Sequence, residues 1–404
     1  MNLLVEGIKN NVVIKTDRAT KLMVDGISQT YPIYQVRLDQ LFFNDKNDRI
    51  ATWINKYLSD NHIESIDKTD REKYNDIIQE FITLSNPERI KQTETNIELI
   101  GQQKYGVVLT DGRIIDGNRR FCCLRNISKR NPQFNYFETV ILDRDYENNV
   151  KQIKMLELQI QIGEEARVDY DPIDKLMGLY RDLVETELLS VKEYAMYTNT
   201  SVKDVENELE VAKLLVEFLE TINAPGQFYL ARELKLDGPL RELQAILKKI
   251  SDEDRKQLMK CVVFTNFLVK PNDDMTRFTR KIKSIASSRF VDDFLEKETE
   301  IAEGVLDSLP ENGQVDSNTI SQVRADDEVK KDLDQTMDIF SNKVKVDETK
   351  NKPNQVLIKA IDSIEAIDTK VISKLTETQQ EEFFDNLDVL IEMLNELKEA
   401  LNKC

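Results

Sequence analysis

The stretch that most constrains the fold of this chain is residues 106–125, GVVLTDGRIIDGNRRFCCLR. Val107–Leu109 reads as a short apolar strand, and Asp111-Gly112 is a dipeptide typical of a tight hairpin turn. A second strand begins at Ile114, and the sequence DGN at 116–118 ends it before a segment of helical character. A strand, a glycine and a helix start therefore follow one another closely, an arrangement that directs backbone amides toward a bound anion.

Two arginines, Arg119 and Arg120, come directly after Gly117. Guanidinium groups form strong, charge-assisted hydrogen bonds with phosphate oxygens. The pattern therefore favours phosphate binding at this turn. The alternative is an ordinary junction between a hairpin and a helix, with both arginines solvated.

The same stretch resembles the phosphate-binding motif of the ParB/sulfiredoxin superfamily, in which a hairpin ends in a sequence such as G-E-R-R-x-x-A. Gly117, Asn118, Arg119, Arg120 and Cys123 occupy these positions, with asparagine in place of glutamate and cysteine in place of alanine. The sequence DGNRR at 116–120 is also similar to the D-G-x-x-R pattern of the nucleotide-hydrolysing branches of this superfamily. The resemblance implies an α+β fold with a small mixed sheet at the N-terminus, and it implies a bound nucleoside triphosphate (CTP or ATP) with Mg²⁺.

The resemblance continues beyond the motif. A strand at 138–143 and a long helix from 149 to about 163 follow the order found in ParB proteins. Those proteins next carry E-N-x-x-R and then L-N-P-I-E. This chain has GEEAR at 163–167 and YDPID at 170–174, and when Pro172 is aligned with the family proline, Arg167 occupies the position of the family arginine.

The resemblance implies that Arg167 contacts phosphate and that Glu164 or Asp116 has a catalytic or metal-binding role. Carboxylate oxygens are suitable ligands for Mg²⁺. Gly163 and Glu164 stand at the positions of the family's glutamate and asparagine, which leaves nucleotide hydrolysis open.

A helix–turn–helix pattern lies at about 188–212. Asn199 follows Ala195 by four residues, and asparagine tolerates the left-handed conformation that such a turn requires. Ser201 is a candidate helix cap, and Val205 takes an apolar packing position. The second helix, SVKDVENELEVAK, carries four acids against two lysines, which repel a DNA backbone. Either this acidic face points away from DNA, or the helix is only a scaffold.

Composition limits the surfaces available for nucleic acid. The chain has 404 residues, with 74 acids against 56 bases and a net charge of −18. Any contact with DNA therefore needs a local basic patch. One candidate patch is a group of four cations within two helical turns: Arg277, Arg280, Lys281 and Lys283. The alternative is a solvated helix face that pairs with nearby acidic segments.

Other sequence features exclude several classes of protein. No apolar run reaches the ~18–20 residues that span a bilayer, and MNLLVEGIKNN lacks the features of a signal peptide, so we expect a cytoplasmic protein without membrane contact. The only histidine, His62, leaves no basis for multi-histidine metal sites. The four cysteines lack metal-site spacing.

The chain divides into four predicted regions. Residues 1–160 form the nucleotide-binding domain, with an inserted pair of helices at about 51–95. Residues 161–290 form a helical domain, and 291–350 read as an acidic linker. Residues 351–404 read as a helical hairpin with leucines at heptad spacing, which either forms a homodimer or docks within the monomer.

One further arginine belongs to the candidate site. Arg49 lies in a loop that resembles the segment near the nucleotide in ParB proteins, so it is a candidate contact to base or phosphate. An exposed loop arginine is the alternative.

Two functions follow from this reading. The first is a nucleotide-switched, DNA-associated partition or regulatory factor, similar to ParB. The second is an NTPase component of a phage-defence or mobile-element system, in which the helix–turn–helix is only a scaffold.

Overall fold

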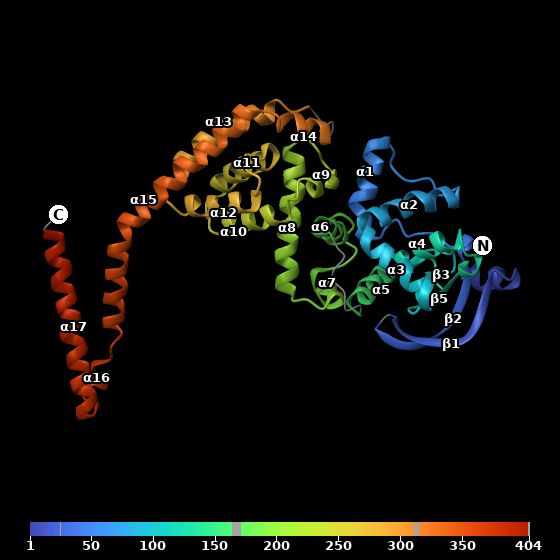
Figure 1. Ribbon diagram of the computed structural model, residues 1–404, viewed down its shortest axis with the longest axis horizontal. Helices are drawn as coiled ribbons and strands as arrows, with labels where there is room; N and C mark the ends of the chain where they lie inside the picture. Colours follow the sequence, from blue (N-terminus) through green and yellow to red (C-terminus); the bar gives the residue numbers. More distant parts are fainter. Residues whose placement is uncertain (25, 164–170, 311–314, 403–404) are drawn as a thin grey trace. The chain divides into compact units, whose positions relative to one another are not determined.

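The protein is an α+β molecule with a mixed sheet at the N-terminus and a mostly helical remainder (Figure 1). The computed structural model describes residues 1–24, 26–163, 171–310 and 315–402. Two compact units are present, Met1–Ser341 and Asn342–Cys404. None of the helices among the described residues has the length and apolar character needed to cross a lipid bilayer.

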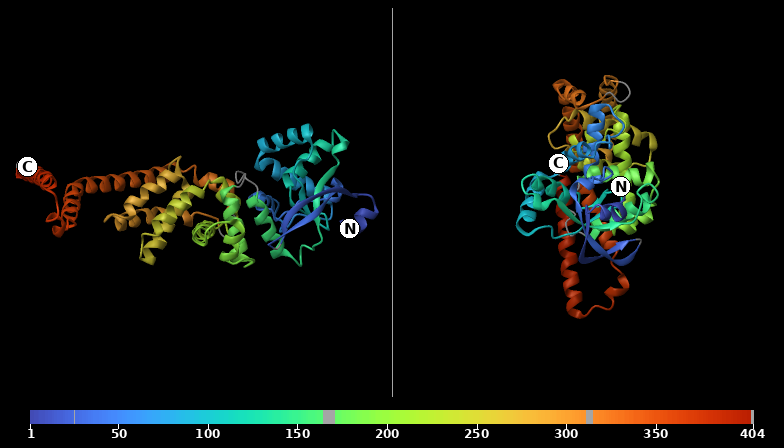
Figure 2. Two further views of the ribbon diagram at one scale, coloured as in Figure 1. Left: turned by 90° about the horizontal axis from the view of Figure 1, so that it is seen from below. Right: turned by 90° about the vertical axis from the view of Figure 1, so that its right-hand side faces the viewer.

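The sheet has five strands in the order β1-β2-β5-β3-β4. The strands are β1 (Val13–Val24), β2 (Ile27–Arg37), β3 (Gly106–Leu109), β4 (Ile114–Asp116) and β5 (Tyr136–Leu142). β3 runs parallel to β5, and the other neighbouring pairs are antiparallel. β1 and β2 form one long two-stranded ribbon (Figures 1 and 2). The mixed sheet and the turn at Gly112, with φ of 93°, confirm the predictions.

Helices cover both faces of the sheet because side chains alternate between the faces along each strand. Val108 and Phe137 pack with Phe121 and Ile78 on one face. Val107 and Val140 pack on the other face with Leu156 and its neighbours. The helices of this region are α1 (Ala51–Asn61), α2 (Arg71–Ser85), α3 (Pro87–Ile100), α4 (Asn118–Ser128) and α5 (Val150–Gly163). The insertion thus contains three helices instead of the expected pair.

Short 3₁₀ and π turns connect these elements. They are η1 (Leu3–Gly7), η2 (Leu38–Gln40), η3 (Asp48–Ile50), η4 (Pro132–Phe134) and, in the helical region, η6 (Arg181–Glu185). Of these, η3 and η6 bring charged side chains close to the site described below.

Two helices meet at a short turn where the sequence predicts a helix–turn–helix. Asn199 ends α7 (Val191–Thr198) with φ of 49°, and Ser201 caps α8 (Val202–Thr221). Ala195 and Val205 are buried in one core cluster. The remaining helices of the first unit are α6 (Pro172–Tyr180), α9 (Phe228–Glu233), α10 (Asp237–Leu247), α11 (Glu253–Val269), α12 (Met275–Ala286), α13 (Val291–Asp307) and α14 (Ser317–Val323).

Residues 291–350 correct the expectation of an acidic linker. The described part of this segment forms α13, α14 and the start of α15 (Asp327–Glu365). Phe294 and Leu295 are buried, and the Phe294 and Phe340 rings pack with centroids 5.6 Å apart. Apolar residues recur at helical spacing on the buried face of α13, and its acids other than Glu298 occupy the exposed face.

The second unit contains the end of α15, α16 (Thr369–Ile372) and α17 (Glu377–Asn402). Two helical arms joined by a short turn agree with the hairpin predicted for 351–404 (Figure 1).

Candidate functional site

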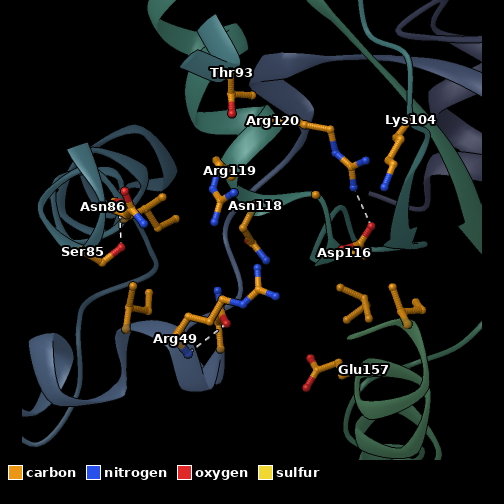
Figure 3. A pocket seen from close by; sticks show the side chains of 16 residues that line it. Arg49, Ser85, Asn86, Thr93, Lys104, Asp116, Asn118, Arg119, Arg120 and Glu157 are labelled. Atoms are coloured by element: carbon orange, nitrogen blue, oxygen red, sulfur yellow. Dashed lines mark hydrogen bonds and ion pairs between the residues drawn. The ribbon is translucent and has the colours of Figure 1, made fainter. Parts of the chain in front are cut away.

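A polar cavity of about 440 Å³ lies where β4 meets α4 (Figure 3). Ligand pockets in proteins commonly have volumes of ~300–1,000 Å³. The η3 loop, the α2–α3 turn and α5 form its other walls. Its principal polar lining residues are Arg49, Ser85, Asn86, Thr93, Lys104, Asp116, Asn118, Arg119, Arg120 and Glu157.

Gly117 makes the sharp passage from β4 into α4 possible. Its φ is 98°, a left-handed conformation that side-chain-bearing residues rarely adopt. A Cβ atom at this position would lie 2.7 Å from Cζ of Phe137, which fills the space beneath the turn. The backbone can therefore approach a ligand closely here, and α4 starts at the next residue, Asn118.

Arg119 and Arg120, the two arginines of the motif, both line the cavity. Arg120 donates a hydrogen bond from Nη2 to Oδ2 of Asp116, over 2.6 Å. This ion pair joins residues i and i+4 and is largely shielded from solvent, with the Arg120 side chain 14% exposed. Asp116 therefore orients Arg120 at the cavity wall.

Arg49 approaches the cavity from the opposite wall (Figure 3). It lies in η3, and the Asn47 side chain caps this turn by accepting a hydrogen bond from the Arg49 amide over 3.2 Å. The structure thus brings Arg49 and the two motif arginines to one site. Lys104, just before β3, adds a cation that the sequence motif did not indicate.

Glu157 is a site residue that sequence reasoning missed. It projects from α5 into the cavity wall, and its side chain accepts a hydrogen bond from Nδ2 of Asn44 over 2.6 Å. Burial raises the pKa of Glu157 to about 8. An isolated glutamate within the apolar run 155–158 is the sequence signal that could have identified it.

The charges at the cavity favour an anion. Four cations line it, and Glu157 is largely protonated at pH 7 because its pKa is raised to about 8. Asp116 is the remaining carboxylate of the lining set. A local excess of positive charge in a protein of net charge −18 is a site that attracts phosphate.

A cluster of buried charges lies behind the η3 wall. Nζ of Lys154 is 2.6 Å from Oδ2 of Asp48 and 2.9 Å from Oδ2 of Asp182. Nη2 of Arg181 is 2.8 Å from Oδ1 of Asp48. Burial opposes the charge of Asp48, but Lys154 and Arg181 outweigh it and hold the pKa of Asp48 below its usual value. The cluster joins the loop that carries Arg49 to α5 and η6.

A second cavity of about 330 Å³ adjoins the first and shares Lys104, Asp116 and Ile160 with it. It extends along β1 and β3, past Tyr105 and Leu22. The two cavities together provide a polar, cationic chamber and a less polar neighbouring one.

Two of the predicted ligands, Glu164 and Arg167, lie outside the described residues. Among the described residues, no group of three or more His, Cys, Asp or Glu side chains forms a metal site. Asp116 is at the cavity but is engaged with Arg120.

The four cations proposed for DNA lie on α12, away from the cavity lining. Arg280 donates to Glu242 of α10 over 2.6 Å, and Lys281 is 3.8 Å from Asp338. Arg277 and Lys283 have no ion pair with another described residue. On α8, the predicted acidic face is partly engaged, because Glu208 pairs with Arg241. The DNA patch is thus partly neutralised within the protein.

In comparisons with known proteins, no family model matches this chain and no curated protein matches it.

Proposed function

We propose that the cavity at the β4–α4 turn binds the polyphosphate of a nucleoside triphosphate, CTP or ATP, and that the protein is a nucleotide-switched, DNA-associated factor of the ParB-like kind. The observation that carries this proposal is the convergence of Arg49, Lys104, Arg119 and Arg120 around a glycine at the start of α4. Helix-start amides and guanidinium groups together bind phosphate well.

In this proposal each residue has a separate role. Gly117 lets the chain approach the phosphates, and Asn118 follows at the helix start. Arg119 and Arg120 bind phosphate oxygens, and Arg49 binds from the opposite wall. Arg167 adds a further phosphate contact, as the resemblance implies.

One carboxylate at the cavity, Asp116, is a candidate ligand for a nucleotide-bound Mg²⁺, although it is paired with Arg120 in this structure. In such sites Mg²⁺ is held by one or two carboxylates together with phosphate oxygens and water. Asp116 lines the cavity and would hold the ion, with Glu164 as the second carboxylate that the resemblance implies. When bound, the ion neutralises phosphate charge.

The buried charge cluster supports a switch. Asp48 lies next to Arg49 in η3, and it binds Lys154 of α5 and Arg181 of η6. A shift of Arg49 toward phosphate therefore acts on the helices that precede the helix–turn–helix. Arg277 and Lys283 contact DNA. They are the two cations of the α12 group that form no ion pair within the described residues.

Substitution of Arg119 by alanine tests the phosphate site. Because a hydrogen bond to a charged group contributes roughly 1.5–3 kcal/mol, R119A should weaken nucleotide binding roughly 10- to 150-fold in isothermal titration calorimetry. R130A is a matched control, since Arg130 follows the same helix, pairs with Glu98 and lies outside the cavity. If R119A and the wild type bind nucleotide with equal affinity, this motif takes no part in nucleotide binding.

A second function, nucleotide hydrolysis, is favoured by Glu157. A buried carboxyl with a pKa of about 8 at the cavity wall has a value near that of an effective general acid or base at neutral pH. Turnover assays with each nucleoside triphosphate, with and without DNA, separate the two functions. Rapid hydrolysis without DNA supports the NTPase, whereas nucleotide-dependent DNA retention with little hydrolysis supports the switch.

A further inference from the structure

The C-terminal hairpin exposes an apolar stripe along its whole second arm. From Lys345 to Asn402, none of the residues is buried. Leu394, Leu397 and Leu401 are 41%, 56% and 77% exposed. Helices depend on packing of an apolar face for most of their stability, and contiguous exposed apolar surface marks an interaction site.

The apolar face of α17 is wider than one neighbouring helix would cover. Its stripe has alternating spacings of four and three: Phe383, Leu387, Leu390, Leu394, Leu397 and Leu401. Phe384 and Ile391 each lie one residue beyond a stripe position, and Met393 lies one residue before another. A two-helix seam needs only the narrow stripe, whereas a broader face is typical of helices in a bundle. The first arm of the hairpin cannot cover this surface alone.

Charges on the two arms are complementary. α17 carries eight acids and one lysine, a net charge of −7. Residues 343–359 of α15 carry five lysines and two acids, a net charge of +3. Two α17 helices would repel each other at close range, so a stable arrangement places each α17 next to α15.

We propose that the hairpins of two copies of this chain associate into a four-helix bundle, in which the α17 of each copy packs against the lysine-rich part of α15 of the other. The two α17 helices then lie on one diagonal of the bundle and the two α15 arms on the other. This arrangement covers the wide apolar face and separates the two acidic helices. It gives α17, about 39 Å long at 1.5 Å per residue, a continuous partner.

The molar mass of the full chain tests the proposal first. Sedimentation equilibrium at micromolar concentrations should give twice the 46.9 kDa of one chain. The double substitution L394D/L397D should return the protein to one chain mass, whereas N395D, a charge added beside the stripe on the same helix, should leave the dimer intact. A wild-type protein with the mass of one chain would overturn the proposal, since the stripe would then be covered within one chain or by another protein.

Charge-reversed variants distinguish pairing between chains from closure of one hairpin on itself. K350E/K352E/K359E makes both arms acidic, and E381K/E382K/E392K/E396K/E399K makes the second arm basic like the first, with six lysines against three acids. Each variant alone should be monomeric, and an equimolar mixture should form a heterodimer because acidic and basic arms then meet across the two chains. A mixture that remains monomeric, while the wild type is dimeric, would show that these arms do not pair between copies. Circular dichroism of each variant establishes that the helices are retained.

Discussion

At the scale of single residues, Glu298 is a buried carboxyl that the proposed function does not use. It lies on α13, and its Oε2 accepts a hydrogen bond from Nδ2 of Asn266 on α11, over 3.0 Å. Burial raises the pKa of Glu298 to about 7, so the folded protein keeps a proton that the unfolded chain loses near pH 4.5. The contribution of Glu298 to stability is therefore complete below about pH 4.5 and is lost as the pH rises through about 7.

Replacing Glu298 with glutamine should remove this dependence. Glutamine keeps the shape and hydrogen-bonding capacity of the neutral acid without a group that ionises. The free energy of unfolding of E298Q minus that of the wild type should therefore be larger at about pH 8 than at about pH 5, by at most about 3 kcal/mol. Urea denaturation at both pH values measures this difference. Glu296, exposed on the same helix, provides the control E296Q, which removes a carboxyl group outside the buried site.

Glu157 gives a second residue-scale prediction, which rests on nucleotide binding at the cavity. Above its pKa of about 8, Glu157 places a negative charge near the arginines that line the cavity. Nucleotide affinity should therefore fall as the pH rises, by roughly tenfold at about pH 9, where about a tenth of the protein retains the proton. In calorimetric titrations at about pH 7 and about pH 9, the nucleotide affinity of E157Q should fall much less than that of the wild type. The same decrease in E157Q would assign the pH effect to another group.

At the scale of elements, the β4–α4 turn depends on Gly117. Alanine at this position requires φ of 98° and places Cβ 2.7 Å from Cζ of Phe137, so G117A should destabilise the protein by about 1–3 kcal/mol. Gly304, within α13, has no atom within 4 Å of an added Cβ. G304A should therefore stabilise the protein by up to about 1 kcal/mol. Chemical denaturation of both variants checks the opposite signs, and a neutral G117A would mean that the turn relaxes easily.

Local signals explain which elements could be predicted from the sequence. The hairpin around Gly112, the helix after Gly117 and the cap at Ser201 each depend on a few adjacent residues. The helical insertion and the mixed sheet followed from periodicity and the resemblance. By contrast, the acidic composition of 291–350 concealed a helix with a regular apolar face, because composition does not record spacing.

Contacts between distant parts of the chain could not be predicted in this way. Asn44 and Glu157 are 113 residues apart, and Asp48 and Arg181 are 133 residues apart. No local pattern pairs them, because the fold alone brings them together. Arg119 and Arg120 were predicted from one short motif and Arg49 from the resemblance of its loop, whereas Lys104, Glu157 and the buried charge cluster appeared only with the tertiary structure.

At the scale of the whole molecule, the buried charge cluster ties the sheet region of the first unit to its helical region. Asp48 comes from η3, Lys154 from α5, and Arg181 and Asp182 from η6. The Lys154 and Asp182 side chains are 7% and 2% exposed, so water cannot replace a lost partner. Buried ion pairs of this kind are costly to break, because one charge is left without compensation.

Replacing Asp48 with asparagine should therefore destabilise the first unit by about 3–5 kcal/mol, since Lys154 and Arg181 lose the carboxylate between them. D39N is the control, because the Arg37–Asp39 pair is exposed and such pairs contribute about 0–1 kcal/mol. If the cluster also couples the two regions, calorimetry of D48N should resolve two unfolding transitions where the wild type has one. A single transition at the wild-type temperature would show that other contacts, such as those between α1 and α9, hold the sheet region to the helices.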